Sequence, residues 1–245
     1  MSYGKLKRYE NLLNTYRELF EDDVFDYVKG VDVTNEISSL SKELETHYEN
    51  KTKSANSYYS PLMAAIRIFF KSQRCLIEVS NQLFKMEIND SLFHIVDKAS
   101  LNKICFGNKI LDIASEVETQ KIKEIFLDAL EHIKLCLPEL EEAHKKISEA
   151  KDQDLVSVLG GGASLLNAKI CFFNSIIMIL EKNFRKSVQN LEESIRHIES
   201  AIKYVNINLD TPGEVENAKR TEAYLRFLIN NYRTSIMTIR EIISD

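Results

Sequence analysis

Glycine and proline are scarce in this chain, and their scarcity limits the folds open to it more than any other feature. The 245 residues include seven glycines and three prolines. Folds built from many short strands need these residues at frequent turns, whereas long helices need few of them. Apolar residues recur at helical spacing, as in Tyr9, Leu12, Leu13 and Tyr16, which indicates helices with one buried face. We therefore predict an all-α fold.

The positions of the helix signals predict about eight or nine helices, packed as an antiparallel bundle or as an array of helical-hairpin repeats. Gly30 is expected to end a first helix over residues 5–28, because glycine is common just after a helix. Pro61 and Pro212 each follow a hydroxyl side chain and predict helix starts, since proline at the first helical position loses no hydrogen bond. A further turn is expected near Asn183.

The middle of the chain is predicted as two more helices, over residues 92–117 and 119–150. Gly107 interrupts the first of them. Pro138 is expected to kink or break the second, because proline removes a backbone hydrogen bond and crowds the preceding turn. We identify no convincing strand.

One weak internal similarity favours repeats. An aromatic residue, a small residue three positions on and an aliphatic residue four positions later recur in three places. Small residues at such positions let two antiparallel helices approach closely, although any amphipathic helix with a small residue on its apolar face would match. The three sets are Phe126, Ala129 and Ile133; Phe184, Ser187 and Leu191; and Tyr232, Ser235 and Ile239.

Three of the seven glycines are consecutive, Gly160–Gly162. A phosphate-binding loop would need a strand before the glycines and a lysine directly after them, and Lys169 lies too far along the next helix. We predict instead a tight turn between two packed helices. The chain is then one helical domain over residues 1–245, or alternatively two sub-bundles, 1–152 and 163–245, joined at this turn.

The segment after the glycines is the most apolar part of the chain. Residues 163–180 reach the lower length limit for a membrane-spanning helix. Lys169 interrupts them, and a central lysine opposes insertion by about 2.5–3.5 kcal/mol. A helix that is apolar almost all round is typical of the centre of a bundle, which is the interpretation we favour. Insertion of residues 155–180 into a membrane is the alternative.

Charge and cysteine content narrow the function classes. A net charge of −5 and a pI near 5.7 argue against a dedicated nucleic-acid binder, which needs excess lysine and arginine. The cysteines lie far apart without metal-binding spacing, so we expect reduced thiols and a cytoplasmic location. These cysteines are Cys75, Cys105, Cys136 and Cys171.

Signals for catalysis or metal binding are weak. Glu141 and His144 form one Glu-x-x-His pair, but a di-iron bundle needs two such pairs and two further glutamates. No serine or cysteine has a sequence context that places a base beside it. We therefore expect no metal, no cofactor and no enzymatic activity.

Rows of cationic residues are the most suggestive functional feature. On the last predicted helix the row recurs every seven residues and drifts by only about 20° per step, and a second row follows Pro61. The two rows are Lys219, Arg226, Arg233 and Arg240, and Arg67, Lys71 and Arg74. Arginine binds carboxylates and phosphates with two parallel hydrogen bonds, although such rows more often pair with acids of neighbouring helices.

From these features we expect a cytosolic, non-enzymatic module that binds another protein. Its partner is either an acidic or phosphorylated peptide or a second copy of the chain, which would make a homodimer. The cationic rows are the predicted contact residues. The alternative hypothesis is a membrane-active helical protein, acting through residues 155–180 or through its cationic faces.

Overall fold

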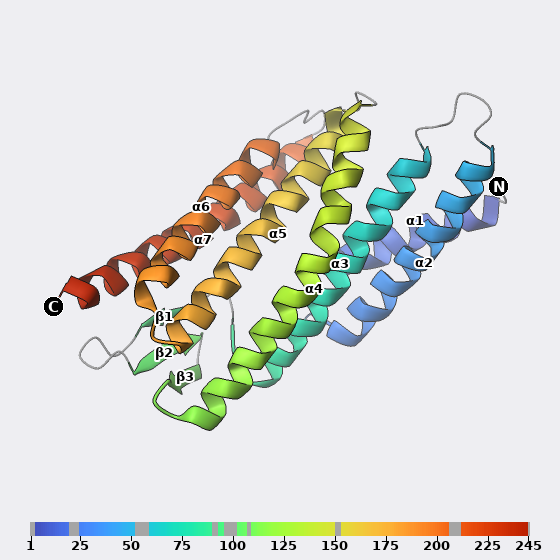
Figure 1. Ribbon diagram of the computed structural model, residues 1–245. Coiled ribbons are helices and arrows are strands. Elements are labelled where there is room, and N and C mark those ends of the chain that lie inside the picture. The colour runs from blue at the N-terminus through green and yellow to red at the C-terminus, as the bar shows by residue number, and fades with distance from the viewer. Residues whose placement is uncertain are drawn as a thin grey trace. The chain divides into compact units, whose positions relative to one another are not determined.

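The computed structural model describes residues 3–19, 25–51, 59–89, 93–95, 102–106, 109–149, 153–205 and 212–244. Within these ranges the chain forms seven helices and one three-stranded sheet (Figure 1). The elements are α1 (Tyr3–Glu18), α2 (Tyr27–Lys51), α3 (Tyr59–Lys85), β1 (Phe93–Ile95), β2 (Lys103–Phe106), β3 (Lys109–Asp112), α4 (Glu116–Glu149), α5 (Gln153–Leu180), α6 (Phe184–Val205) and α7 (Pro212–Ser244). The prediction of a predominantly helical chain is confirmed, whereas the count of eight or nine helices and the repeat arrangement are not.

The chain divides into two compact units. Unit 1 comprises Met1–Glu78 and Leu135–Leu159, and unit 2 comprises Val79–Lys134 and Gly160–Asp245. The boundaries between the units fall inside α3, α4 and α5. The assignment of residues 1–245 to one domain stays a prediction.

The start of α2 corrects the prediction that Gly30 ends the first helix. Asp26 caps α2, because its carboxylate accepts a hydrogen bond from the backbone N–H of Lys29 at 3.0 Å. Gly30 therefore lies in the first turn of α2. A Cβ atom added to Gly30 would lie 3.0 Å from the Phe25 ring, so the glycine serves close packing rather than helix termination.

A hydrophobic cluster holds α1, α2 and α3 together in unit 1. Its apolar side chains recur at helical spacing on the facing sides of these helices. The buried members are Tyr9, Val33, Ile37, Leu40, Leu44, Met63 and Phe70.

The sheet overturns the prediction of a helix over residues 92–117. Strand β2 pairs antiparallel with both neighbours, Phe93 of β1 lies opposite Phe106, and Phe106 lies opposite Lys109 of β3. Only two residues, Gly107 and Asn108, separate β2 from β3, and both lie outside the described residues. A two-residue connection between antiparallel strands is a β-hairpin. In β2 the three consecutive residues Ile104, Cys105 and Phe106 are buried, whereas in β3 only Leu111 is buried.

Aromatic side chains form the core of unit 2. Phe172 of α5 stacks on Tyr232 of α7 with ring centroids 4.8 Å apart, and Phe93 of β1 lies 5.3 Å from Phe172. Phe126 of α4 meets Phe173 of α5 edge to face at 5.0 Å. These rings connect the sheet to three helices, and the hydroxyl of Ser235 on α7 also donates a hydrogen bond to the backbone carbonyl of β1 at Phe93.

The predicted turn at Gly160–Gly162 is wrong, because all three glycines lie inside α5. The helix continues because neighbouring packing offsets the poor helix propensity of glycine. A Cβ atom added to Gly161 would lie 3.3 Å from the Cβ atom of Tyr204 on α6, so the missing side chain lets α6 pack closely. The proposed sub-bundles 1–152 and 163–245 consequently have no turn at this point.

The predictions at Pro138 and near Asn183 had different outcomes. Helix α4 runs through Pro138 without ending, so the predicted break does not occur. The predicted turn near Asn183 is confirmed: Lys182 has a positive φ of 58°, and the N–H of Asn183 donates to the carbonyl of Met178 at 2.7 Å. This is a Schellman ending for α5. The side chain of Asn183 then accepts a hydrogen bond from the N–H of Lys186 in the first turn of α6.

Buried hydroxyl groups join α5 to α6 in unit 2. The hydroxyls of Ser175 and Ser187 lie 2.8 Å apart, and the hydroxyl of Ser194 donates to the carbonyl of Ala168 at 2.8 Å. Ser187 is one of the small residues of the sequence similarity, so its size does serve a close contact between helices. Ile176 and Ile179 of α5 are fully buried, whereas Val158 and Leu165 of the same helix are exposed.

We predict that Gly161→Leu lowers the free energy of unfolding by about 1–3 kcal/mol, because the new side chain overpacks the contact with Tyr204. Gly213→Leu is the matched control, since a Cβ atom there meets nothing within 4 Å; its effect should stay within about 0.5 kcal/mol. Urea denaturation followed by circular dichroism measures both. Equal effects of the two substitutions would contradict the close contact.

Candidate functional site

The arginine row of α7 lies beside α6, which is its neighbour in unit 2 (Figure 1). Arg233 donates to Glu199 of α6 at 3.1 Å, and Arg240 donates to Glu192 of α6. Glu192 and Glu199 are seven residues apart, as are the two arginines, so the pairs repeat every two turns. Helix α6 therefore supplies the acidic partners of Arg233 and Arg240.

The other two cations of this row differ from each other. Arg226 pairs with Glu222 one turn earlier on α7 at 2.6 Å. Lys219 is exposed and forms no ion pair within the described part of the chain. The three arginine side chains are each about 60% exposed, and exposed pairs of this kind contribute only about 0–1 kcal/mol.

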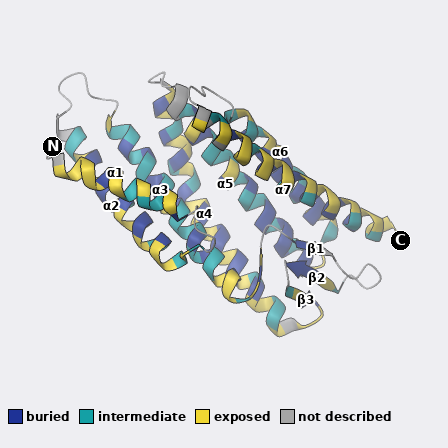
Figure 2. Cartoon of the chain, turned by 180° about the vertical axis from the view of Figure 1, so that it is seen from behind, coloured by how far each residue is buried: buried dark blue, intermediate teal, exposed yellow. Residues whose placement is uncertain are grey.

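An uncharged strip runs along the solvent face of α7, next to the arginine row. Its five exposed residues follow three- and four-residue spacing, and Figure 2 shows exposed residues along this helix. At about 100° per residue, the strip lies opposite the buried face of α7 and roughly 80° from the arginines. Phe227 is 50% exposed and Met237 is 62% exposed. The α7 strip consists of Ala223, Phe227, Asn230, Thr234 and Met237.

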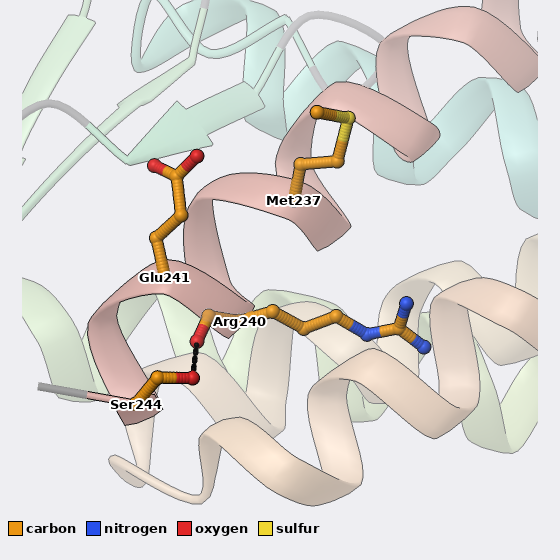
Figure 3. A pocket seen from close by; sticks show the side chains of 4 residues that line it. All are labelled: Met237, Arg240, Glu241 and Ser244. Carbon is orange, nitrogen blue, oxygen red and sulfur yellow. Dashed lines mark hydrogen bonds between the residues drawn. The ribbon is translucent and has the colours of Figure 1, made fainter.

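A hollow open to solvent lies at the C-terminal end of this surface (Figure 3). Met237, Arg240, Glu241 and Ser244 line it. The guanidinium of Arg240 extends away from the carboxylate of Glu241, and the hydroxyl of Ser244 donates to the carbonyl of Arg240 at 2.8 Å. The hollow thus combines an apolar thioether with a cation on one helix.

The cationic row of α3 belongs to unit 1, and its members contact different partners. Arg67 donates to Glu45 of α2 at 3.1 Å, and Glu45 is only 8% exposed. Lys71 lies 3.9 Å from Glu139 of α4. Arg67 therefore mainly compensates the charge of the buried Glu45 carboxylate.

The third member of the α3 row, Arg74, contacts two groups. It donates to Glu78 on its own helix at 2.9 Å and to Asn35 of α2 at 2.6 Å. Both contacts lie near the surface, so Arg74 compensates no buried charge.

The four cysteines are free thiols in the structure. Cys75 of α3 and Cys136 of α4 are hydrogen-bonded to each other in unit 1. Burial raises the pKa of Cys105 and of Cys171 in unit 2. Among the described residues, no three His, Cys, Asp or Glu side chains lie close enough to hold a metal ion.

Sequence reasoning found the arginine row but missed what surrounds it. The equal seven-residue spacing of Glu192 and Glu199 was a visible signal for the ion pairs with α6. The strip with Phe227 and Met237 was missed because its spacing is also that of a buried helix face. Only the packing of α7 distinguishes its solvent face from its core face.

We predict that Arg67→Met lowers the free energy of unfolding by about 1–3 kcal/mol, because Glu45 is buried and would keep only the surface cation of Lys42 as a partner. Arg74→Met is the control, and should cost less than about 1 kcal/mol, since both ends of its pair with Glu78 are near the surface. Urea denaturation of both variants is the measurement. A loss from Arg74→Met as large as that from Arg67→Met would contradict this assignment.

The chain was compared with protein families, curated proteins and solved structures. No protein-family model, curated protein or solved structure matches the chain. The surface of α7 combines exposed apolar and cationic groups and is the candidate site.

Proposed function

We propose that the chain is a non-enzymatic, cytosolic protein-binding module, and that its partner is an acidic or phosphorylated helical segment docked on α7. One observation carries the proposal: the uncharged α7 strip lies beside three exposed arginines. Aromatic residues, methionine and arginine are the residue types enriched at protein interfaces. A partner helix would place apolar residues on Phe227 and Met237 and acids along the arginine row.

The ion pairs with α6 are compatible with such a partner. Each pair is exposed and therefore weak, so the arginines can keep Glu192 and Glu199 as neighbours while a further carboxylate or phosphate approaches. The guanidinium has five N–H donors, more than one carboxylate uses. The glutamates also hold Arg233 and Arg240 in place, which lowers the entropy lost when the partner binds.

The α3 row is left out of this docking surface. Arg67 is largely buried against Glu45, and withdrawing it would leave a buried carboxylate uncompensated. The proposal therefore rests on Arg226, Arg233 and Arg240 with the α7 strip, and Lys219 extends the same row by two turns.

We predict that a photo-crosslinking residue at Thr234 captures a partner in cells of the source organism, whereas the same residue at the exposed Lys121 of α4 does not. With that partner, Arg233→Glu should weaken binding by about tenfold or more, because one attraction becomes a repulsion. Arg196→Glu is the matched control: Arg196 is equally exposed and pairs with Glu193 on α6. Binding is measured by titration calorimetry.

A charge-swapped variant separates binding from stability. Arg233→Glu combined with Glu199→Arg keeps an ion pair but moves the cation to α6, so stability should recover while binding stays weak. Unchanged affinity in Arg233→Glu, or crosslinks confined to Lys121, would overturn the docking surface. A crosslink between two copies of this chain would identify the partner as a homodimer instead.

The membrane hypothesis has one specific observation in its favour. Within the described residues, α5 is the one helix long and apolar enough to cross a membrane, from Val156 to Leu180, and 56% of its most apolar window is buried inside the protein. In unit 2 this segment supplies core residues such as Phe172 and Ile176. Insertion would therefore require the core of unit 2 to open.

We predict that the protein does not float with anionic liposomes in a sucrose gradient at low salt, because its apolar segment is engaged in packing. Flotation that persists at high salt would indicate insertion of α5 and replace the present proposal. Flotation lost at high salt would indicate binding of lipid headgroups by the cationic faces.

A further inference from the structure

Two thiols from distant parts of the sequence meet in unit 1. Cys75 lies on α3 and Cys136 lies on α4, and their side chains share a hydrogen bond. The ion pair of Lys71 with Glu139 joins the same two helices. Lys71 is one turn from Cys75 and Glu139 is one turn from Cys136, so two independent contacts fix how these helices face each other.

The two sulfurs differ in their access to solvent. Cys136 is 1% exposed, whereas Cys75 is half-buried. A small reagent therefore reaches the pair from the side of Cys75. Cys136 is held behind it, in the position that a resolving thiol occupies when two cysteines act in sequence.

The surroundings of the pair favour a thiolate. The hydrogen bond from Cys75 lowers the pKa of Cys136 to about 7, and burial opposes this effect. The positive charge of Lys71 lowers the pKa further, and the carboxylate of Glu139 raises it. Near pH 7 about half of the pairs therefore carry a thiolate, and this titration belongs to the pair.

The other two cysteines provide an internal contrast. Burial raises the pKa of Cys105 on β2 and of Cys171 on α5, and Glu193 adds to the effect at Cys171. Cys171 is half-buried, like Cys75. Exposure to solvent therefore does not distinguish Cys75 from Cys171. The neighbouring sulfur of Cys136 and the charge of Lys71 distinguish them.

We propose that Cys75 and Cys136 form a redox-active dithiol that a low-molecular-weight disulfide converts reversibly into a covalent bond between α3 and α4. The modification is independent of the docking surface proposed on α7, since the pair belongs to unit 1. Through this pair the chain exchanges electrons with the small thiols and disulfides of its compartment.

The reaction proceeds by two thiol–disulfide exchanges. The sulfur of Cys75 attacks one sulfur of the small disulfide as its proton passes to Cys136; a mixed disulfide forms and a small thiolate leaves. That thiolate takes the proton from Cys136. The Cys136 thiolate then attacks the sulfur of Cys75, the protein disulfide forms, and a second small thiolate leaves. The protein loses two electrons and the small disulfide gains them.

Oxidation of the full-length protein by glutathione disulfide tests the proposal. Peptide mass spectrometry without reduction should find Cys75 linked to Cys136, with dithiothreitol reversing the link. The initial rate should rise with pH around 7, as the thiolate fraction of the pair grows. Lys71→Met should slow the reaction about twofold at neutral pH, because loss of the lysine's charge raises the pKa of Cys136 and lowers the thiolate fraction of the pair. Cys136→Ser should stop at a mixed disulfide on Cys75.

Matched variants keep the result interpretable. Cys105→Ser and Cys171→Ser should leave the rate and the product unchanged. Circular dichroism confirms that each variant is folded before its rate is compared. A product that links any other pair of cysteines, or glutathione retained on Cys75 of the wild-type protein, would overturn the proposal. An equal rate in Lys71→Met would remove the role of the lysine and contradict the charge argument.

Discussion

One set of aromatic contacts joins the sheet, α4, α5 and α7 in unit 2. Phe93 and Phe106 of the sheet, Phe126 of α4, Phe172 and Phe173 of α5 and Tyr232 of α7 bring together elements from four regions of the sequence. Each ring removes a large apolar surface from water, and edge or stacked contacts add to that stabilisation. This core leaves α7 with a fixed solvent face, on which the uncharged strip and the arginines lie. The candidate docking surface is thus a consequence of how Tyr232 is anchored.

The surface charges follow from the same anchoring. With α7 held against α6, residues seven apart on both helices come into register, and glutamates of one meet arginines of the other. Such pairs add little stability because they remain in water. They do fix the orientation of long, flexible side chains, and an oriented guanidinium loses less entropy when it binds a carboxylate. The acidic net charge of the chain is therefore compatible with a locally cationic surface.

Helical periodicity was sufficient to predict the helical class, and local helix signals predicted the turn near Asn183 and the start of the last helix at Pro212. It failed where local signals compete with tertiary packing. By propensity, Gly161 and Gly30 look like helix ends, yet each lies inside a helix. At both positions a neighbouring side chain packs where a Cβ atom would otherwise lie, so tertiary packing favours glycine there. The strands were missed because Gly107, which with Asn108 forms a hairpin signal between two apolar runs, was interpreted as an interruption within a helix. The arginine row was predictable from spacing, but the contact of Cys75 with Cys136, 61 positions later in the sequence, was not.

Neither unit corresponds to one uninterrupted length of chain. Unit 1 needs Leu135–Leu159 in addition to its N-terminal part, so on the ribosome α1, α2 and the first part of α3 must wait until α4 has emerged. Unit 2 in turn waits for α7. Contacts that span such long sequence separations slow folding, and a fragment cut at any one peptide bond would leave at least one of the two cores incomplete.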